Sequence, residues 1–264
     1  MNIPPISDQA FERYSRQIML PEWGEVAQHL VSNAKVLIIG CGGLGTAAGL
    51  YLAGAGVGYL VIADDDTVEY SNLARQVAYR ESDIGIAKAN ALATQLKALN
   101  KNVQCRPVKR RLSERVLEIE VSLADIVLDC SDNMETRQAI NKACINLCTP
   151  LVVGAAIGWN GQLMVFDFGF STSPCYHCLF PMGSDALSRN CQSSGIIGPV
   201  VGIIGNLQAL ETLKFLTQKA SPYTRFYQFE GKTLLLHALL VQSDPECDIC
   251  SPKLREVPDE DLVK

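Results

Sequence analysis

The amino-acid sequence predicts a doubly wound α/β fold, in which helices cover a mostly parallel sheet that antiparallel strands extend. Short apolar runs alternate with helical patterns through the first two-thirds of the chain, as expected of parallel strands that are buried on both faces. The first run, Val36–Ile39, leads directly into a glycine-rich loop and a helix of small residues. After residue 160 the alternation gives way to a predicted β-hairpin, which indicates antiparallel strands at one edge of the sheet.

The patterns of the first two-thirds bound its elements. Apolar runs predict strands at 36–39, 59–63, 103–107, 124–128 and 151–153. Helical patterns predict helices at 46–55, 88–99 and 134–147, and Ser113 is a candidate N-cap of one more helix. Because strands and helices repeat as βα units, we expect ligands to bind at the carboxyl ends of the strands.

The last third follows a different pattern. A strand at 162–167 precedes a polar, loop-like stretch at 171–194, and a long helical pattern runs over 200–218. Two apolar segments, 226–230 and 233–241, flank Gly231 and Lys232 and predict a hairpin with a two-residue turn. Polar residues interrupt the most apolar stretch of the chain, so we predict a buried helix there and no membrane span.

Composition favours a soluble intracellular enzyme. The chain has 264 residues, of which 48% are hydrophobic, and a net charge of −5 without a basic stripe, which argues against nucleic acid as the main partner. The first residues lack the charged and apolar regions of a secretory signal. Ten cysteines without such a signal fit a reduced compartment, and we expect the cytoplasm.

Four cysteines form two C-x-x-C pairs, Cys175 with Cys178 and Cys247 with Cys250. Each pair can place two thiolates on one metal ion, and two pairs complete a tetrahedral shell. We therefore predict a structural zinc site that ties the end of the chain to a mid-chain loop. The alternatives from spacing alone are four ordinary buried cysteines or two redox dithiols.

The glycine-rich loop has the pattern Gly40-x-Gly42-x-x-Gly45 between a predicted strand and a predicted helix. Glycines at these positions permit a tight turn, close approach of the backbone to phosphate and close packing of the helix. Asp64 ends the second strand, where an acid can bind a ribose. These features are typical of a Rossmann-like nucleotide site, and alone they would favour a NAD enzyme. The chain has no G-x-x-x-x-G-K-[ST] stretch, which excludes a P-loop ATPase.

Charged residues near other strand ends argue against a dehydrogenase. A polar run follows the second strand, and Arg75 in this run could hold phosphates with its planar guanidinium. Lys88 begins the next predicted helix and supplies another cation. Asp132 follows the fourth strand, where a carboxylate can hold Mg²⁺ against a triphosphate. Together they indicate ATP and Mg²⁺, although each residue alone could be a solvated surface charge.

Five segments make the chain resemble a known family. They are Arg13-Tyr-Ser-Arg16-Gln17, Gly40-Cys-Gly-Gly-Leu-Gly45, Asp64-Asp-Asp-Thr-Val68, Ser71-Asn-Leu-Ala-Arg75-Gln76 and Asp129-Cys-Ser-Asp132-Asn133. With both C-x-x-C pairs, they resemble the motifs of the ThiF/MoeB/HesA family, the bacterial relatives of ubiquitin-activating enzymes. The resemblance covers the chain from about residue 11 to 250 and departs at Ala74, where the family often has Gln.

The resemblance implies an adenylyltransferase. Members of the family bind ATP with Mg²⁺ and activate the C-terminal Gly-Gly carboxylate of a small ubiquitin-like protein as an acyl-adenylate. At the matching positions, the nucleotide-binding residues would be Gly40, Gly42, Gly43, Gly45, Asp64, Asp66, Asn72, Arg75, Gln76, Lys88, Asp132 and Asn133. The catalytic residues would be Arg16, Arg75, Lys88, Asp132 and Cys191. The zinc ligands would be Cys175, Cys178, Cys247 and Cys250.

The resemblance also implies partners. Within the family, the chain is most similar to members that act on a ThiS-like sulfur carrier in thiamine thiazole synthesis, and activation of a molybdopterin synthase carrier is the alternative. A homodimer is implied, in which Arg16 reaches the ATP of the partner subunit. Cys191 would engage the activated carrier or exchange sulfur that a donor enzyme supplies.

A single domain is expected over residues 1–264, with a helical segment at 1–34, a nucleotide-binding half at 35–160 and a carrier-binding and zinc half at 161–250. Two other function classes stay open. A NAD-dependent oxidoreductase is supported only by the glycine loop and Asp64. A non-catalytic scaffold that binds the carrier is disfavoured because the charged residues of the expected site are intact.

Overall fold

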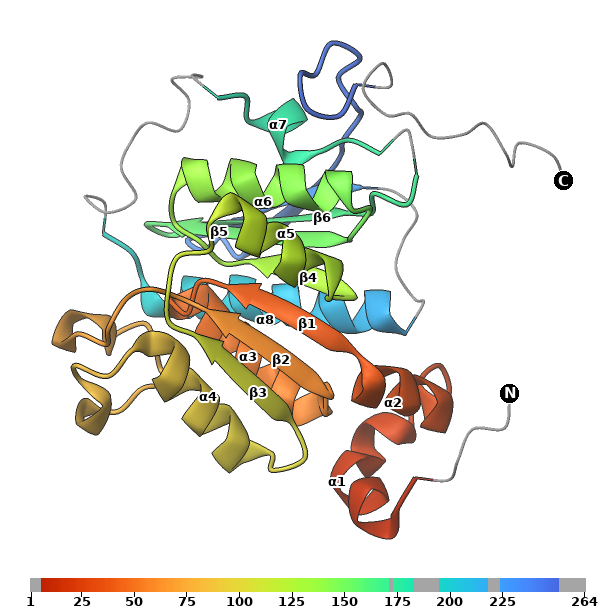
Figure 1. Cartoon of the computed structure of the whole chain (residues 1–264), viewed down its shortest axis with the longest axis vertical. Coiled ribbons are helices and arrows are strands. Elements are labelled where there is room, and N and C mark those ends of the chain that lie inside the picture. The colour runs from red at the N-terminus through yellow and green to blue at the C-terminus, as the bar shows by residue number, and fades with distance from the viewer. Residues whose placement is uncertain (1–5, 171–172, 183–194, 218–223, 252–264) are drawn as a thin grey trace, which may run out of the picture.

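One sheet runs through the whole molecule. The computed structural model describes residues 6–170, 173–182, 195–217 and 224–251. In this part of the chain eight strands form one sheet, in the order β3-β2-β1-β4-β5-β6-β7-β8 (Figure 1). The strands are β1 (Lys35–Ile39), β2 (Tyr59–Ala63), β3 (Gln104–Val108), β4 (Ile126–Asp129), β5 (Leu151–Ile157), β6 (Asn160–Phe166), β7 (Arg225–Glu230) and β8 (Leu235–Leu240). Strands β1 to β5 are parallel, and β6, β7 and β8 extend the sheet antiparallel, which confirms the predicted fold class.

Helices cover both faces of the parallel strands (Figure 1). The helices of the described residues are α1 (Asp8–Ile18), α2 (Gly24–Asn33), α3 (Gly43–Ala55), α4 (Lys88–Leu99), α5 (Glu114–Ser122), α6 (Met134–Asn146), α7 (Tyr176–Leu179) and α8 (Gly198–Leu216). Helices α3, α4 and α8 pack on one face of these strands, and α5 and α6 pack on the other. Alternate residues of β1 belong to different cores. Val36 and Ile38 share a core with α3, α4 and α8, whereas Leu37 and Ile39 share one with α5 and α6. Burial on both faces explains why the first strand reads as one continuous apolar run.

The N-terminal helix α1 is fixed against the carboxyl ends of α3 and α4. The hydroxyl of Tyr14 on α1 accepts a hydrogen bond of 2.8 Å from Nδ2 of Asn100, the residue that follows α4. Asn100 is fully buried, and the same Nδ2 donates to the carbonyl oxygen of Ala53 on α3 at 2.8 Å. These helix ends lie beside the starts of the strands, so α1 is remote from the glycine loop at the strand ends (Figure 1).

Some predicted boundaries differ from the structure. Helix α3 begins at Gly43 with Gly42 as its N-cap, so the glycine loop itself forms the first helical turn. The low helix propensity of glycine conceals this start in the sequence. Ser113 is the N-cap residue of α5, as predicted, but its side chain makes no capping hydrogen bond.

The connection between β7 and β8 differs more from its predicted length. Glu230 pairs with Leu235, so four residues connect β7 to β8, and the predicted two-residue turn is wrong. The N–H of Gly231 bonds to the carbonyl oxygen of Trp159 at 2.7 Å, which ties it to the neighbouring β5–β6 turn. Leu234 closes the connection in a left-handed conformation, with a φ of +58°.

Among the described residues, no helix has both the length and the apolar character needed to span a bilayer.

Candidate functional site

A large pocket opens at the carboxyl ends of the central strands. Strand β1 lies between β2 and β4, so the chain winds away from β1 in one direction and from β4 in the other, which leaves a crevice between them. The pocket has a volume of about 1480 Å³. Most of the predicted nucleotide-binding residues line it, namely Gly40, Gly42, Gly43, Asp64, Asp66, Asn72, Arg75, Gln76, Lys88, Asp132 and Asn133.

Close backbone contacts hold the glycine loop. Gly40 has a φ of +97°, and a Cβ there would lie 2.6 Å from the carbonyl oxygen of Cys130, just after β4. Gly45 does not line the pocket, because it packs beneath the loop, where a Cβ would lie 1.9 Å from the carbonyl oxygen of Gly40. Glycines at both positions let the N-terminus of α3 approach the end of β1, which creates a site suited to an anion.

Asp64 connects the glycine loop to the segment after β2. Its Oδ2 accepts a hydrogen bond of 2.6 Å from the N–H of Cys41, and its Oδ1 accepts one of 2.8 Å from the N–H of Asp66. Burial raises the pKa of the Asp64 carboxyl, and these two backbone donors and Lys88 oppose that rise. The carboxylate oxygens have further lone pairs, so the half-buried side chain can still accept hydrogen bonds from a ribose.

Lys88 contributes a buried positive charge at the start of α4. The residue is 7% exposed, and its Nζ lies 2.8 Å from Oδ2 of the exposed Asp66. An ammonium group buried this far requires an anionic or hydrogen-bonding partner. The ion pair therefore holds Lys88 in the pocket wall, where it can also interact with a phosphate.

Three further predicted residues lie at the short 3₁₀ turn η1 (Tyr70–Asn72). Asn72 is its last residue, and Arg75 and Gln76 follow it. Asn72 is buried, and its Oδ1 accepts a hydrogen bond of 3.1 Å from the N–H of Glu69. Arg75 is half-buried and donates from Nη1 to the carbonyl oxygen of Ser71 at 3.0 Å. Gln76 is 2% exposed, and its Oε1 has no hydrogen-bond partner in the described part of the chain. A buried acceptor without a donor is costly, so Gln76 is suited to accept a hydrogen bond from a ligand.

Asp132 and Asn133 lie between β4 and α6. Asn133 is the N-cap of α6, and its Oδ1 accepts a hydrogen bond of 2.9 Å from the N–H of Thr136. Asp132 is exposed at the pocket, where Nδ2 of Asn133 lies 3.5 Å from its Oδ1. This carboxylate is open to a cation that enters with an anionic ligand.

Of the predicted catalytic residues that the structure describes, Arg16 alone does not line the pocket. Arg16 is exposed on α1, near the amino ends of the parallel strands, and does not line the pocket of its own chain (Figure 1). Cys191 lies outside the described residues.

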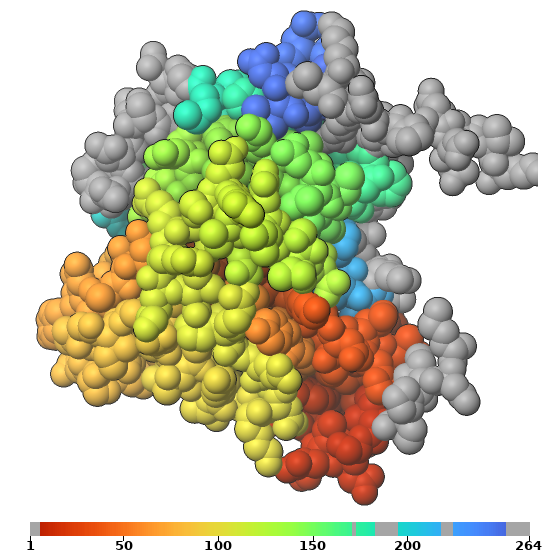
Figure 2. Space-filling view, viewed as in Figure 1, coloured from red at the N-terminus to blue at the C-terminus, as the bar shows by residue number. Residues whose placement is uncertain are grey.

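The four cysteines of the C-x-x-C pairs come together beside α7, which packs against the middle of α6 through Gln138 and Asn141 (Figure 1). In Figure 2 the segment around residues 173–182 lies against the segment that includes residues 241–251. All four sulfur atoms lie within 4.8 Å of one another. The Sγ atom of Cys175 is 3.8 Å from those of Cys178 and Cys247, and Cys178 Sγ is 3.3 Å from Cys250 Sγ. Zn–S bonds of about 2.3 Å in a tetrahedron give S–S separations of about 3.8 Å, so this donor set fits zinc.

The pocket wall includes one member of a buried ion pair that the sequence pattern did not predict. Oδ2 of Asp129, the last residue of β4, is 3.9 Å from Nη1 of Arg137 on α6. Burial raises the pKa of the Asp129 carboxyl, and Arg137 acts against that rise. Arg137 shares a helix face with the buried Ile140 and Cys144. A charge on this apolar face is the sequence signal that could have revealed the pair.

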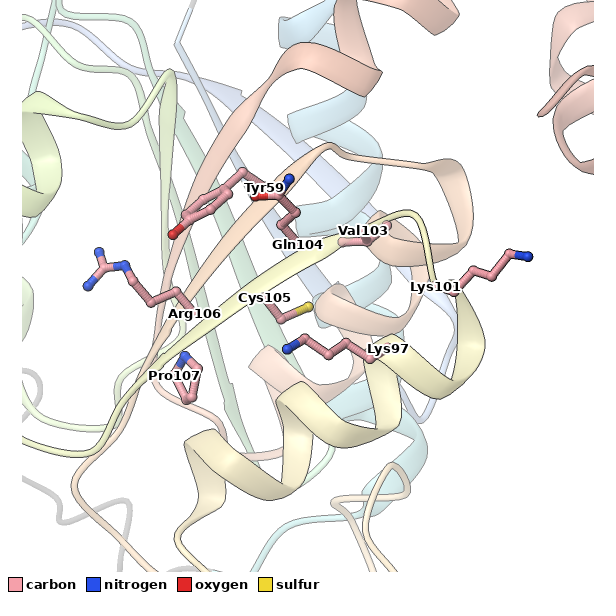
Figure 3. Close-up of a pocket in the computed structure, with 8 residues that line it drawn as sticks. All are labelled: Tyr59, Lys97, Lys101, Val103, Gln104, Cys105, Arg106 and Pro107. Atoms are coloured by element: carbon pink, nitrogen blue, oxygen red, sulfur yellow. The ribbon is translucent and has the colours of Figure 1, made fainter. Parts of the chain in front are cut away.

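A second hollow, of about 670 Å³, lies at the β3 edge of the sheet. Its lining includes Lys97, Lys101 and Arg106, but these cations do not converge. Figure 3 shows Arg106 extending to one side of β3 together with Tyr59, while Lys101 points away on the other side. The hollow therefore lacks the geometry of an anion site.

Comparison with known proteins identifies related sequences. A profile of the ThiF family matches residues 14–249. The sulfur carrier protein ThiS adenylyltransferase of Escherichia coli (strain K12) is 44% identical over 245 residues, which are 93% of this chain and 97% of that protein. The molybdopterin-synthase adenylyltransferase of Salmonella typhimurium is 36% identical over 247 residues, or 93% and 98% of the two chains. The adenylyltransferase and sulfurtransferase MOCS3 of Caenorhabditis briggsae is 42% identical over 251 residues; these are 93% of this chain but only 61% of that protein.

Solved structures share the fold. The crystal structure of E. coli MccB with ATP superposes with a TM-score of 0.78 at 24% identity, covering 90% of this chain and 73% of that one. At this level of identity, the likeness concerns the fold alone.

The glycine loop provides a matched pair of substitutions on one helix. Gly45→Ala places a Cβ against the carbonyl oxygen of Gly40, whereas Gly54→Ala on α3 meets nothing within 4 Å. We expect Gly45→Ala to lower the free energy of unfolding by about 2 kcal/mol or more. Gly54→Ala should raise it by up to about 1 kcal/mol through helix propensity. Urea denaturation measures both, and equal midpoints for the two variants would contradict the packing described.

Proposed function

The chain belongs to the ThiF family, and we propose that it uses ATP to adenylate the C-terminal carboxylate of a ubiquitin-like sulfur carrier. The observation that carries this proposal is the convergence of Arg75, Lys88 and Asp132 with the glycine loop in one pocket. A dinucleotide enzyme would need the same loop and Asp64, but it would have no use for two cations and a free carboxylate placed for a triphosphate.

The reaction needs positioning and charge neutralisation. One carboxylate oxygen of the carrier attacks the α-phosphorus of ATP, and the bond from that phosphorus to the bridging oxygen of pyrophosphate breaks. The products are an acyl-adenylate and pyrophosphate. Because the attacking carboxylate is already ionised at neutral pH, the enzyme needs no general base. It must hold two anionic reactants together and stabilise the charge that develops on the leaving group.

We assign different pocket residues to the ribose, the phosphates and Mg²⁺. We assign Asp64 and Gln76 to the ribose side, because both present acceptors for hydroxyl groups. Arg75 and Lys88 neutralise phosphate oxygens, and Lys88 can exchange its ion pair with Asp66 for a phosphate contact. Asp132 is the residue that would hold Mg²⁺, which when bound neutralises charge on the triphosphate.

We propose a ThiS-like protein as the carrier, with the thiazole of thiamine as the destination of the sulfur. The E. coli relative named for ThiS matches this chain over nearly its whole length at higher identity than the relative named for molybdopterin synthase. The molybdopterin synthase carrier remains the second candidate, since that relative also matches end to end.

Strand β8 is the surface that we assign to the body of the carrier. It is an edge strand of the sheet, and its sequence LLHALL is exposed along its whole length. The exposed leucines of the connection and the strand are Leu234, Leu235, Leu236, Leu239 and Leu240. An exposed apolar patch of this kind on a folded protein is typical of an interaction site.

The register of the strands places β8 within reach of the pocket. Ile157, which lines the pocket, pairs with Asn160, which pairs with Glu230, and Glu230 pairs with Leu235. The start of β8 therefore lies at the same end of the sheet as the pocket mouth. A globular carrier on β8 could extend a flexible Gly-Gly tail past residues 195–198 to the nucleotide.

We further propose a homodimer in which Arg16 serves the site of the partner subunit. Exposed apolar side chains just after α1, on α2 and α3 and on α8 support an interface there, namely Met19, Leu20, Val26, Tyr51 and Leu210. Arg16 is exposed on α1 and remote from the pocket of its own chain, so it could reach an ATP only from another subunit. A guanidinium supplied in this way would stabilise charge on the phosphates.

The zinc site is assigned a structural role, since a closed Cys₄ shell leaves no open position for a substrate. Cys191 is assigned to the step after adenylation, in which sulfur from a donor enzyme reaches the activated carrier. Adenylation itself involves no thiol, so the two steps can be separated by mutation.

Exchange of labelled pyrophosphate into ATP tests the main proposal. We expect exchange only when a Gly-Gly-tailed carrier is present. Asp132→Ala should reduce it by at least about 100-fold, because the triphosphate loses the residue that holds its metal. Cys191→Ser serves as the control and should keep nearly the full exchange rate. Reduction of NAD by the protein, or full exchange by Asp132→Ala, would exclude the scheme.

Substitution on β8 separates carrier binding from nucleotide binding. Leu235→Asp places a charge in the apolar strand and should raise the KM for the carrier by about tenfold or more, with little change in the KM for ATP. Leu123→Asp, at an exposed leucine after α5, is the matched control and should change neither constant. An unchanged carrier KM in Leu235→Asp would move the docking surface elsewhere.

Mixed dimers test the role of Arg16. Arg16→Ala and Asp132→Ala subunits should each be inactive alone. In a heterodimer of the two, one site combines an intact Arg16 with an intact Asp132 of the other subunit, so about half of the wild-type exchange should return. Purified heterodimers without recovered activity would show that Arg16 acts within its own subunit or has no role.

Metal analysis tests the cysteine cluster. Freshly purified protein should contain about one Zn²⁺ per chain, and Cys250→Ser should lose most of it together with thermal stability. Cys148→Ser removes an exposed cysteine outside the cluster and should leave both unchanged. Metal-free protein with four reactive thiols and wild-type stability would refute the assignment.

A further inference from the structure

The buried pair of Asp129 and Arg137 has no part in the proposed chemistry, although Arg137 lines the pocket. Asp129 is 0% exposed and Arg137 is 7% exposed. Burial of two charges carries a large desolvation cost, which favourable geometry and further hydrogen bonds must offset. Replacing such a pair with apolar residues is often neutral or stabilising in other proteins, so stability alone does not account for this pair.

The two residues hold Ser131 from opposite sides. Oδ1 of Asp129 accepts hydrogen bonds from the N–H of Ser131 at 2.9 Å and from its hydroxyl at 2.6 Å. Nη2 of Arg137 donates to the carbonyl oxygen of the same residue. Ser131 directly precedes Asp132, so the peptide groups on both sides of Ser131 are held, one through its N–H and the other, which leads into Asp132, through its carbonyl oxygen.

Arg137 also connects this turn to the next strand. The same Nη2 donates to the carbonyl oxygen of Gly154 on β5 at 2.9 Å. Residues 155–157, which follow Gly154, line the pocket. The guanidinium thus sets the separation between the Asp132 turn and the β5 wall of the pocket.

Helix α6, which bears Arg137, is also hydrogen-bonded to the turn that contains Cys175 and Cys178. Nε2 of Gln138 donates to the carbonyl oxygen of Phe180 at 2.7 Å, and Oδ1 of Asn141 accepts from the N–H of Tyr176 at 2.9 Å. The Arg137 guanidinium lies 6.0 Å from the centre of the Tyr176 ring. The helix that positions Asp132 is therefore anchored at the turn that carries Cys175 and Cys178.

We propose that Arg137 is a positioning residue for adenylation, which acts by holding the Asp132 carboxylate at the place where it meets Mg²⁺ and the triphosphate. This inference rests on the proposed function. A planar guanidinium can donate to two carbonyl oxygens and face Asp129 at once, whereas the ammonium of lysine is a point charge on a flexible stem. Misplacement of a catalytic group by about 1 Å is enough to cost about 100-fold in rate.

Arg137→Lys keeps the positive charge and removes the planar guanidinium with its several N–H donors. At saturating carrier, we expect the Mg²⁺ concentration for half-maximal pyrophosphate exchange to rise about tenfold or more, while the KM for the carrier changes less than about twofold. Zinc content and the thermal midpoint, measured on the same preparation, show whether the fold and the cysteine cluster are retained. The matched control is Arg106→Lys, which removes a guanidinium from the carboxylate of Glu120; neither residue lines the nucleotide pocket, so the Mg²⁺ requirement should be unchanged.

A double-mutant cycle with Asp132→Asn decides whether Arg137 acts through Asp132. If it does, Arg137→Lys raises the Mg²⁺ concentration for half-maximal exchange about tenfold in the wild-type background and hardly changes it in the Asp132→Asn background. Equal losses in both backgrounds, or an unchanged Mg²⁺ requirement in Arg137→Lys, would overturn the positioning role and leave the adenylation proposal intact. Full exchange by Asp132→Asn alone would instead count against the role of Asp132 in the proposed function.

Discussion

The position of β1 between β2 and β4 is the constraint on which the rest of the site depends. Because the chain winds outward from both sides of β1, the ends of β1, β2 and β4 meet around one crevice. Each strand end then supplies one part of the site: the glycine loop, the acidic segment with its cations, and the Asp132 turn. The close contacts of Gly40 with Cys130 and of Gly45 with Gly40 bring these parts together, since no side chain fits between them.

Much of this could be predicted from local patterns. Helix α4 begins and ends where the sequence indicates, because its apolar residues recur at helical spacing and Asn100 ends the pattern. The pocket residues were predictable because topology brings the carboxyl ends of parallel strands together wherever they lie in the chain. The two C-x-x-C pairs met as expected, since each spacing presets half of a tetrahedral shell.

Other features depend on contacts that no local pattern encodes. Four residues connect the hairpin strands, and Gly231 in this connection is hydrogen-bonded to Trp159 on a neighbouring turn. The sequence around Gly231 and Lys232 does not predict that long-range bond. The contacts of the buried Arg137 side chain with Ser131 and Gly154 require β4 and β5 to be paired, so they cannot be predicted from local sequence. Arg16 could be recognised by its motif, yet its distance from the pocket of its own chain follows from how α1 packs against α3 and α4.

The uncovered edge of β8 has a consequence for handling and for the cell. Its outer N–H and C=O groups pair with no further strand among the described residues, and His237 is the one polar side chain in LLHALL. Natural proteins usually protect such edges with lysine, proline or a bulge, because a bare apolar edge acts as a template for association with other strands. The opposite edge of this sheet carries that protection, since β3 contains Arg106 and Pro107. Under the proposed docking of the carrier on β8, synthesis of this protein in excess of the carrier would leave the apolar edge bare and favour aggregation.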